Sequence, residues 1–410
     1  MNLLSVAEAR ERILTHFQPV EAEYLPLDRC AQRVLSADVA AATDLPLFDN
    51  SSMDGFAVRT ADVANAAPDS PRTLRVVADI PAGSQPTIFL APGQAARIMT
   101  GAPLPQGADA VVPVEDTDFQ NREAGLPAPK QVKIFQSVKV GDSTRSRGMD
   151  VHAGEVVLRA GRVLNAPELG LLAMLGEARV PVYRKPRVAL LSSGDELIPV
   201  DAPLAPGKIH DSNSYMLSAL LESANVDVIH LGVAADQRES VEALLEKAVN
   251  QKADLILTSA GVSVGAFDFV KEVIESNGKM DFWRVNMRPG KPLAFGEYRG
   301  VKFIGLPGNP VSAFVGFEVF VRPALGRLSG SGAASRPTVR VRLGEDVESD
   351  GRESYLRAEV RQENGVLTAY LSGHQGSANL LALTRANALL IIPAGVKSAP
   401  ANREVDAWML

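Results

Sequence analysis

The 410-residue sequence contains one cysteine, Cys30, which excludes an internal disulfide and a multi-cysteine zinc or iron–sulfur site. No apolar run approaches the ~20 residues that a membrane-spanning helix needs. The first residues lead directly into a charged amphipathic stretch, which is not the pattern of a secretory signal peptide. His152, His210, His230 and His374 are scattered, without the spacing of a metal-ligand pair. These absences predict a cytoplasmic protein with no membrane partner.

Positive charge is also in short supply. The 48 Asp and Glu residues outnumber the 42 Lys and Arg residues, which gives a net charge of -6. Because binding to a phosphate backbone requires a cationic surface, this balance argues against nucleic acid as a partner. Hydrophobic residues make up 46% of the chain, enough for several cores. At roughly 150 residues per domain, the length predicts two to four domains.

The N-terminal part mixes helical and β-like patterns. Residues 6–17 alternate apolar and charged positions at helical spacing, with Ser5 as the N-cap, and residues 166–175 predict a second helix. Between them, short β-like runs such as 74–80 and 110–114 are separated by Pro and Gly clusters. This part is therefore predicted to be a small β-rich unit flanked by helical segments.

From Pro186 to Leu325, apolar runs alternate with amphipathic helices, which is typical of a parallel α/β sheet. A small-residue linker at 329–335 follows, and the tail after it predicts a small all-β domain. The predicted strands of the α/β unit are 187–191, 226–233, 254–258 and 301–306, and its predicted helices are 214–224, 240–249, 270–275 and 312–325. The sequence therefore predicts a multidomain protein that combines α/β and β architecture.

Acidic residues follow the predicted strands of this sheet. Asp195 and Glu196 come after the first strand, Asp236 after the second and Asp268 after the third. Ligands of an open parallel sheet bind beyond the carboxyl ends of its strands, and Gly/Ser loops there let backbone N–H groups approach an anion. Carboxylates beside phosphates require a cation between them, and Mg²⁺ is the usual one. Each acidic residue alone also fits a helix N-cap, but the set favours a phosphate and Mg²⁺ site.

Three further segments are rich in polar or charged residues. The stretch 282–292 places Arg284, Arg288 and Lys291 around a Pro-Gly turn stiffened by two prolines, which suits a small oxyanion as well as a solvated basic turn. The stretches 49–55 and 100–112 are turn-rich and, taken alone, fit structural turns. These residues by themselves do not name a substrate.

Seven short segments occur in order along nearly the whole chain: Phe48–Ala57, Ile98–Val112, Ser193–Leu197, Asp211–Asn213, Ala260–Gly265, Arg288–Pro292 and Leu306–Ser312. Any one of these segments is weakly specific, whereas seven in register are highly specific. Together they resemble the MoeA family of molybdopterin molybdenumtransferases, to which the E-domains of gephyrin and of its plant counterpart are similar.

The resemblance implies four domains. Domain I is helical and segmented (1–45 and 142–180) and forms a homodimer, and the β-rich domain II (46–141) is inserted into it. Domain III (181–328) is a doubly wound α/β domain similar to MogA, which carries the pterin, nucleotide and Mg²⁺ site. Domain IV (335–410) is a small β-barrel. The family's active cleft lies between the α/β domain of one subunit and the second domain of the other.

The implied activity is insertion of molybdate into adenylylated molybdopterin with release of AMP, with Mg²⁺ as cofactor. Further expected partners are the adenylyltransferase and proteins that mature downstream molybdoenzymes. Residues important for activity are Asp54, Thr100, Asp150, Glu196, Asp236 and Asp268, of which Glu196, Asp236 and Asp268 are the predicted Mg²⁺ ligands. Molybdate-binding residues are Arg284, Arg288, Lys291, Ser312, Arg357 and Ser377. Substrate phosphate and pterin are held by Ser193, Gly194, Gly261, Ser263, Gly265, Pro307, Gly308, Asn309 and Pro310.

The sequence departs from the family pattern at three places. Arg284 and Arg288 stand where relatives carry Lys, and a planar guanidinium contacts an oxyanion differently from an ammonium. Residues 373–377 differ from the usual Gly-Ser-Gly pattern, which affects the role of Ser377. Alternative functions are a MogA-like molybdopterin adenylyltransferase, a CinA-like nucleotide hydrolase and a non-catalytic scaffold like gephyrin. Neither of the two enzymes carries the N-terminal half, and the scaffold is expected to carry fused linkers.

Overall fold

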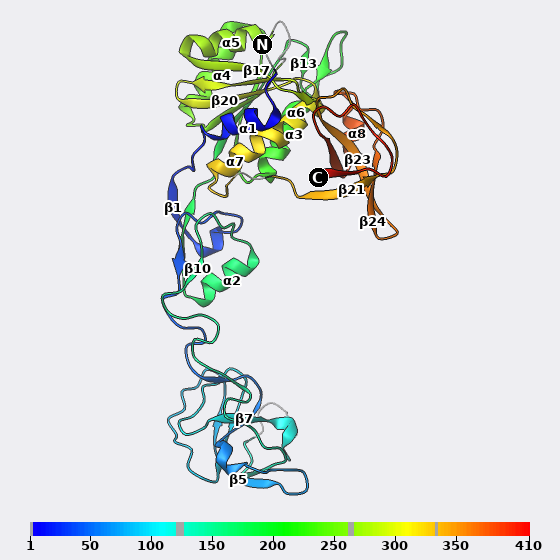
Figure 1. Ribbon diagram of the computed structural model, residues 1–410. Coiled ribbons are helices and arrows are strands. Elements are labelled where there is room, and N and C mark those ends of the chain that lie inside the picture. The colour runs from blue at the N-terminus through cyan, green and yellow to red at the C-terminus, as the bar shows by residue number, and fades with distance from the viewer. Residues whose placement is uncertain (1–2, 120–126, 261–265, 333–334) are drawn as a thin grey trace. The chain divides into compact units, whose positions relative to one another are not determined.

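A computed structural model describes residues 3–119, 127–260, 266–332 and 335–410 (Figure 1). The chain divides into two compact units. One unit contains residues 1–37, 160–173 and 177–410, and the other contains residues 38–159 and 174–176. Within the described residues, no helix has both the length and the apolar character needed to cross a membrane.

The predicted N-terminal helix is present as α1 (Val6–Leu14). Ser5 caps it: the Ser5 Oγ accepts a hydrogen bond from the Glu8 N–H (3.2 Å), and the Glu8 carboxylate accepts one from the Ser5 N–H (3.0 Å). Its apolar face, including Ile13, is buried in the core of the α/β sheet. The segments that follow in this unit are strands β1 (Ala22–Pro26) and β11 (Arg179–Tyr183), which pair antiparallel, and helix α2 (Ala166–Met174).

The other unit is built on a five-stranded sheet in the order β7-β4-β6-β5-β8. Gly55 is required at the start of β4, because a Cβ there would lie 2.1 Å from the Val112 carbonyl oxygen of the neighbouring strand. The strands of this sheet are β4 (Gly55–Val58), β5 (Arg72–Ile80), β6 (Gln94–Ile98), β7 (Ala110–Pro113) and β8 (Gln131–Ile134). Short pairs are β2 (Val39–Ala40) with β10 (Val156–Leu158), and β3 (Asn50–Ser51) with β9 (Thr144–Arg145). The predicted β-rich character of this part is therefore confirmed.

The α/β sheet has six strands in the order β15-β12-β16-β20-β19-β17. The first four are parallel, as predicted, and helices cover both faces of the sheet (Figure 1). The strands are β12 (Arg187–Ser193), β15 (Asp227–Ala234), β16 (Leu255–Ala260), β17 (Gly278–Arg284), β19 (Pro292–Tyr298) and β20 (Val301–Leu306). Helices α4 (Arg238–Asn250) and α5 (Ala266–Asn277) pack in one core, and helices α1, α3 (Ser212–Ser223), α6 (Pro310–Gly316) and α7 (Arg322–Leu328) pack in the other. The doubly wound architecture is thus confirmed.

Two features of this unit were not predicted. The segment that the sequence indicated as a basic loop is a hairpin, in which β17 and β19 pair antiparallel and add to the edge of β20. The predicted single helix after β20 is interrupted by a π-helical turn, η4 (Phe317–Val321), between α6 and α7. The hairpin was missed because its prolines and glycines were interpreted as breaks in regular structure, although Pro292 occupies the first position of a strand, where proline is tolerated. The π-helical turn was missed because the apolar pattern after β20 predicts one continuous helix.

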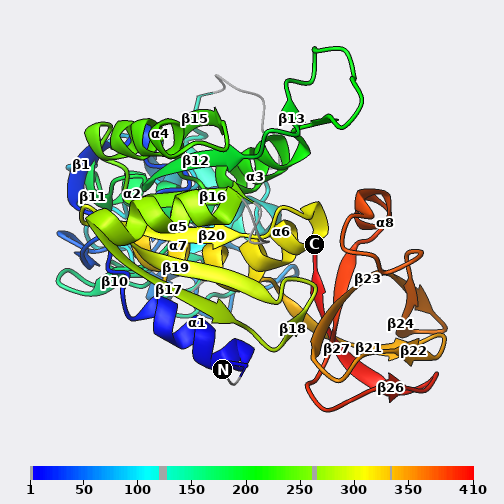
Figure 2. The same ribbon diagram turned by 90° about the horizontal axis from the view of Figure 1, so that it is seen from above.

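The C-terminal region is a closed barrel, as predicted (Figure 2). Its strand order is β23-β24-β21-β27-β25, and β25 pairs back with β23. The strands are β21 (Thr338–Leu343), β23 (Glu353–Glu363), β24 (Val366–Leu371), β25 (Ala388–Ile392) and β27 (Glu404–Met409). Shorter elements of this region are β22 (Val347–Glu348), β26 (Ser398–Ala399) and α8 (Leu380–Thr384). Earlier in the chain lie the short strands β13 (Leu197–Ile198), β14 (Ile209–His210) and β18 (Met287–Arg288). Strand β18 pairs with β23 and thereby joins the β17–β19 hairpin to the barrel.

Candidate functional site

A polar pocket of about 410 Å³ lies at the carboxyl edge of the parallel sheet. Its lining comes from the ends of β12 and β20, where sequence reasoning placed the substrate. The predicted site residues in the lining are Ser193, Glu196, Pro307, Gly308, Asn309 and Ser312. Sequence reasoning did not select Leu197, Ile209, Asn213, Ser259 and Pro292, which also line it. The Ser193 Oγ is buried and has no hydrogen-bond partner within the described structure.

Carboxylates gather beside this pocket. The Asp236 N–H donates to the Asp195 carboxylate (3.0 Å), and the Asp195 N–H donates to the Asp236 Oδ2 (3.4 Å). The Asp236 Oδ1 is buried without a hydrogen-bond partner among the described residues. Burial, followed by the charges of Asp195 and Glu196, raises the pKa of Asp236, against the hydrogen bond from the Asp195 backbone. This accumulation of negative charge would be relieved by a cation.

No three His, Cys, Asp or Glu side chains in the described part of the chain are arranged to hold a metal ion together. Mg²⁺ commonly takes only one or two carboxylates and completes its shell with water and phosphate oxygens. Asp236 with its unpartnered oxygen and the neighbouring Glu196 fit that donor set. Of Asp268 only the backbone is described, in α5. Gly261, Ser263 and Gly265 lie outside the described residues.

Gly194 has a structural reason to be glycine. Its φ is +141°, and a Cβ there would lie 2.5 Å from the Glu196 Oε2. The Glu196 carboxylate therefore folds back over the backbone of the strand end, close to Ser193. The sequence signal for this arrangement is the Ser-Gly-Asp-Glu run directly after β12.

A second cluster lies where the α/β sheet meets the barrel, and Arg357 is its centre. The Arg357 side chain is completely buried in β23. Its Nη2 donates to the carbonyl oxygens of His374 (3.1 Å) and Gly376 (3.0 Å). Its Nε and Nη1 have no partner within the described structure. Burial, and secondly the charge of Arg288, lowers the pKa of Arg357 to about 10. Two nitrogen atoms of a buried cation, which together carry three N–H donors, are therefore left without a partner within the described structure.

Other predicted anion-binding residues approach this cluster. Arg288 lies on β18, which pairs with β23. A Cβ on Gly290 would lie 3.5 Å from the Ser312 carbonyl oxygen, so the hairpin turn lies against the start of α6. The Ser377 carbonyl oxygen accepts a hydrogen bond from the Val311 N–H (3.0 Å), which places residue 377 at the same junction. Arg288, Ser312, Arg357 and Ser377 are thus brought together.

Arg284 and Lys291 lie at the two ends of the loop that connects β17 to β19, and both are exposed. A residue that sequence reasoning missed is Gln375, whose side chain accepts from the Arg357 N–H (2.9 Å) and donates to the Arg357 carbonyl oxygen (3.1 Å). Gln375 belongs to the segment that departs from the family pattern. In this protein, the departing segment therefore holds the backbone of Arg357 through both hydrogen bonds of Gln375.

In the other unit, Asp54 and Thr100 contact each other directly. The Thr100 N–H and Oγ1 both donate to the Asp54 Oδ1, each at 2.7 Å. Asp150 is exposed, and its N–H donates to the Leu45 carbonyl oxygen (2.9 Å). Near Asp150 in the sequence, the Arg147 side chain donates to Asp44 (2.6 Å). The structure thus brings together two predicted residues that lie 46 positions apart in the sequence.

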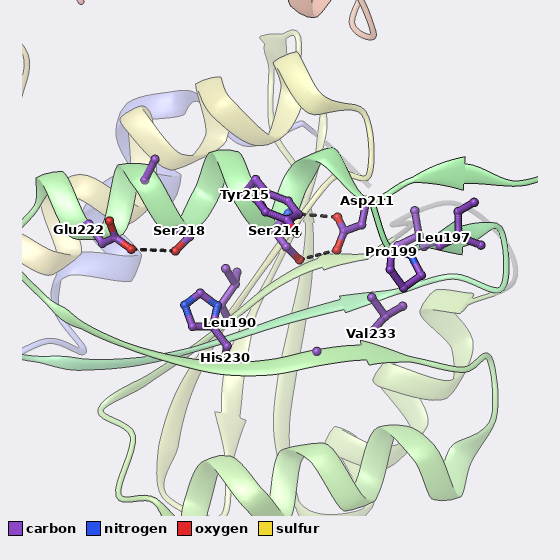
Figure 3. Close-up of a pocket in the computed structure, with 13 residues that line it drawn as sticks. Leu190, Leu197, Pro199, Asp211, Ser214, Tyr215, Ser218, Glu222, His230 and Val233 are labelled. Atoms are coloured by element: carbon purple, nitrogen blue, oxygen red, sulfur yellow. Dashed lines mark hydrogen bonds between the residues drawn. The ribbon is translucent and has the colours of Figure 1, made fainter. Parts of the chain in front are cut away.

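A larger, mainly apolar pocket of about 680 Å³ lies between α3 and the edge strand β15 (Figure 3). Its lining includes Leu190, Tyr215 and Val233, together with Asp211 and Ser214, which contact each other (Figure 3). None of the predicted site residues that the structure describes lines it. It shares Leu197 with the polar pocket.

Comparison with known proteins gives consistent matches along the chain. Residues 4–176 match the MoeA N-terminal region (domain I and II), residues 189–327 a probable molybdopterin binding domain, and residues 340–410 the MoeA C-terminal region (domain IV). The chain is 41% identical to molybdopterin molybdenumtransferase 2 of Mycobacterium tuberculosis over 394 residues, covering 94% of each protein. It is 38% identical to the molybdopterin molybdenumtransferase of Nostoc sp. over 392 residues, covering 94% of this chain and 88% of that protein.

Solved structures agree with these matches. The molybdopterin biosynthesis MoeA protein of Pyrococcus horikoshii is 30% identical to this chain, and the match has a TM-score of 0.82 and covers 100% of each chain. Both the sequence relatives and this structure therefore cover the whole architecture rather than the α/β unit alone. The chain belongs to the MoeA family of molybdopterin molybdenumtransferases.

Proposed function

We propose that this chain inserts molybdate into adenylylated molybdopterin and releases AMP. The observation that carries this proposal is the buried guanidinium of Arg357, whose Nε and Nη1 lack partners within the described structure. A buried charge is costly unless an opposite charge accompanies it. Arg288 beside it increases that cost. A tetrahedral dianion such as molybdate would satisfy the unused donors through charge-assisted hydrogen bonds.

The polar pocket supplies the second part of the proposal. Its unpartnered Ser193 hydroxyl, together with the loop 307–310, is proposed to hold the phosphates of the adenylylated substrate. Glu196, Asp236 and Asp268 are the proposed ligands of Mg²⁺, which when bound would neutralise phosphate charge and polarise phosphorus. Ser312 lines this pocket and also lies against the hairpin turn that carries Arg288. The two substrates would therefore bind side by side.

In the proposed reaction, the two dithiolate sulfurs bond to molybdenum and displace two oxo groups. The phosphoanhydride bond is cleaved with the elements of water, and AMP leaves. Each displaced oxo group must take up two protons to leave as water, so proton-carrying groups are needed. Asp54, oriented by Thr100, or the exposed Asp150 is proposed to relay these protons. Lys291 and Arg284 are proposed to attract molybdate to the hairpin.

The alternative functions have less support. A MogA-like adenylyltransferase or a CinA-like hydrolase would require only the α/β unit, whereas the family matches extend from residue 4 to residue 410. An adenylyltransferase also consumes ATP, which the proposed insertion does not need. A non-catalytic scaffold gives no reason for a buried Arg357 whose Nε and Nη1 have no partner within the described residues.

The proposed reaction can be tested with Asp236→Asn. Purified wild-type protein is expected to release AMP from adenylylated molybdopterin only when molybdate and Mg²⁺ are both present. In Asp236→Asn this release should fall by roughly 100-fold, because loss of a metal ligand exceeds the 10–100-fold cost of losing an outer-shell partner. AMP is quantified by chromatography over time.

The matched control is Asp227→Asn, which changes an exposed carboxylate at the other end of the same strand, β15, and should retain activity. Melting of both variants should show that neither is unfolded. Undiminished AMP release by Asp236→Asn would refute the metal assignment, and ATP-dependent AMP formation by the wild type would favour the adenylyltransferase.

A cytoplasmic homodimer is also part of the proposal. The family resemblance supports the homodimer, and the single, buried cysteine supports the cytoplasmic location. Sedimentation velocity should then give a species of twice the 43.6 kDa chain mass at micromolar concentration. A species of the monomer mass at micromolar concentration would contradict the homodimer and leave the proposed reaction unaffected.

A further inference from the structure

A chain of hydrogen-bonded side chains runs beneath the polar pocket at the carboxyl edge of the sheet. The Ser214 hydroxyl contacts the Asp211 carboxylate, as Figure 3 shows. The Ser192 Oγ lies 2.9 Å from the Ser214 Oγ and 2.8 Å from the Ser259 Oγ. Ser192 and Ser259 are partners in register on the adjacent strands β12 and β16, and both are buried. This series of hydrogen bonds therefore links Asp211, which lines the apolar pocket, to Ser259, which lines the polar pocket.

The direction of every hydrogen bond in this series from Asp211 to Ser259 is fixed. A carboxylate carries no proton and can only accept, whereas each hydroxyl has a single hydrogen to donate. Ser214 must therefore give its hydrogen to Asp211. Ser192 must give its hydrogen to Ser214, and Ser259 must give its own to Ser192. The Ser259 oxygen consequently offers only lone pairs to the pocket that it lines.

Asn213 places a second acceptor in the same pocket. Its Nδ2 donates to the Gly308 carbonyl oxygen (2.7 Å), and because a carbonyl can only accept, the orientation of the amide is fixed. The Asn213 side chain is buried, with 8% of the residue exposed. Its Oδ1 has no hydrogen-bond partner within the described structure. Ser259 and Asn213 thus both present acceptors, and neither can turn a donor toward a ligand without breaking an existing bond.

We propose that Ser259 and Asn213 recognise hydrogen-bond donors of the substrate and exclude its phosphates from this part of the pocket. Phosphate oxygens act as acceptors, so they would meet lone pairs here and gain nothing. The fitting chemistry is a group with adjacent N–H or O–H donors. In the substrate of the proposed function, on which this assignment rests, such donors occur on the aminopyrimidinone edge of the pterin and on the ribose diol. Ser193, whose hydroxyl has no partner within the described residues, remains the donor for phosphate.

Asp211, Ser214 and Ser192 act as positioning residues in this scheme, because they set the polarity of Ser259 without lining the polar pocket. Asp211 has a further structural role, since its carboxylate also caps α3 through the Ser214 N–H (3.1 Å). A pocket of fixed acceptors should reject ligands that lack the matching donors, because the acceptors are then left unpaired.

The test compares ligand pairs that differ only in donors. Calorimetry measures binding of AMP against 2′,3′-dideoxy-AMP, and of pterin against its analogue methylated at the 2-amino group and N3. Wild-type protein should bind the donor-lacking member of one pair roughly 10- to 100-fold more weakly, as expected for buried acceptors left unpaired. The affected pair identifies ribose or pterin as the group bound.

Two variants separate recognition from structural damage. In Ser259→Ala, the preference within the affected pair should shrink to about threefold or less. In Ser214→Ala, Ser192 can donate to Ser259 instead, so Ser259 gains a hydrogen for the pocket and the preference should also narrow, although Ser259 itself is intact. A merely structural Ser214 would weaken both members of the pair equally. Melting curves verify that both variants are folded.

Equal or unmeasurable binding within both pairs by the wild type would overturn the proposal, as would a preference that persists unchanged in Ser259→Ala. These outcomes differ from failure of the proposed function. In that case the ligand preference would be present, but AMP release would not depend on molybdate.

Discussion

Replacement of Arg357 by methionine is expected to abolish molybdate-dependent AMP release and, at the same time, to stabilise the protein. Molybdate would lose two charge-assisted hydrogen bonds of about 1.5–3 kcal/mol each, so the rate at low molybdate should fall by roughly 10²–10⁴-fold. The methionine side chain fills similar volume without a charge. AMP release at a series of molybdate concentrations measures the first effect.

The gain in stability follows from the burial of Arg357. A pKa lowered to about 10 means that the folded state disfavours the charged side chain by roughly 3 kcal/mol. Because the folded-state pKa is depressed, this penalty is fully present at neutral pH and is relieved only as the pH rises above about 10. Methionine removes the penalty but leaves the His374 and Gly376 carbonyl oxygens without their donor, so the net gain should be about 1–2 kcal/mol.

Two measurements make this prediction specific. Molybdate should raise the melting temperature of the wild type, because it binds the folded state, and should have no effect on Arg357→Met. Arg361→Met is the matched control, since Arg361 is an exposed arginine on the same strand that pairs with Glu359. It should keep both the activity and the molybdate effect. An Arg357→Met variant that still responds to molybdate would show that the anion binds elsewhere.

The part of the site that sequence reasoning located lies at the ends of parallel strands. Glu196 and the 307–309 loop are more than a hundred residues apart, yet both follow strands of one parallel sheet, so topology alone predicts that they meet. Parallel strands are buried on both faces and produce continuous apolar runs that are readily recognised. The two antiparallel strands, β17 and β19, lack this signal, so their hairpin was interpreted as a loop.

The unpredicted part of the site depends on hydrogen-bond partners. Nothing in the sequence distinguishes Gln375, which clamps Arg357, from a surface glutamine. Ser192 and Ser259 did carry a signal, because each places a hydroxyl next to the last residue of a mostly apolar strand. The direction of their hydrogen bonds, however, follows only from the position of Asp211. Fold and location were therefore predictable, and donor or acceptor character was not.

The largest expected loss of stability comes from Glu318→Gln. Glu318 is buried in the π-helical turn and accepts four hydrogen bonds, two from Arg322 (2.6 and 2.9 Å) and two from Arg336 (3.0 and 2.9 Å). Arg336 lies just after the linker and two residues before the first barrel strand, so this triad ties the start of the barrel to the helical segment that follows β20. Removing the one negative charge leaves two partly buried cations uncompensated, which should cost about 3–5 kcal/mol.

The pH dependence of this loss has a defined sign. Burial alone would raise the pKa of Glu318, but the hydrogen bonds from Arg322 and Arg336 outweigh burial and hold the pKa below its usual value. The stabilisation by Glu318 is therefore complete above the ordinary carboxyl pKa of 4.5 and is lost as the pH falls through the lower folded-state value. Urea unfolding at pH 7 should show the full difference between wild type and Glu318→Gln, and this difference should shrink in acid. Glu404→Gln, which removes an exposed partner of Arg340, should cost less than about 1 kcal/mol at either pH. A Glu318→Gln variant no less stable than this control would mean that the triad contributes nothing beyond an ordinary surface pair.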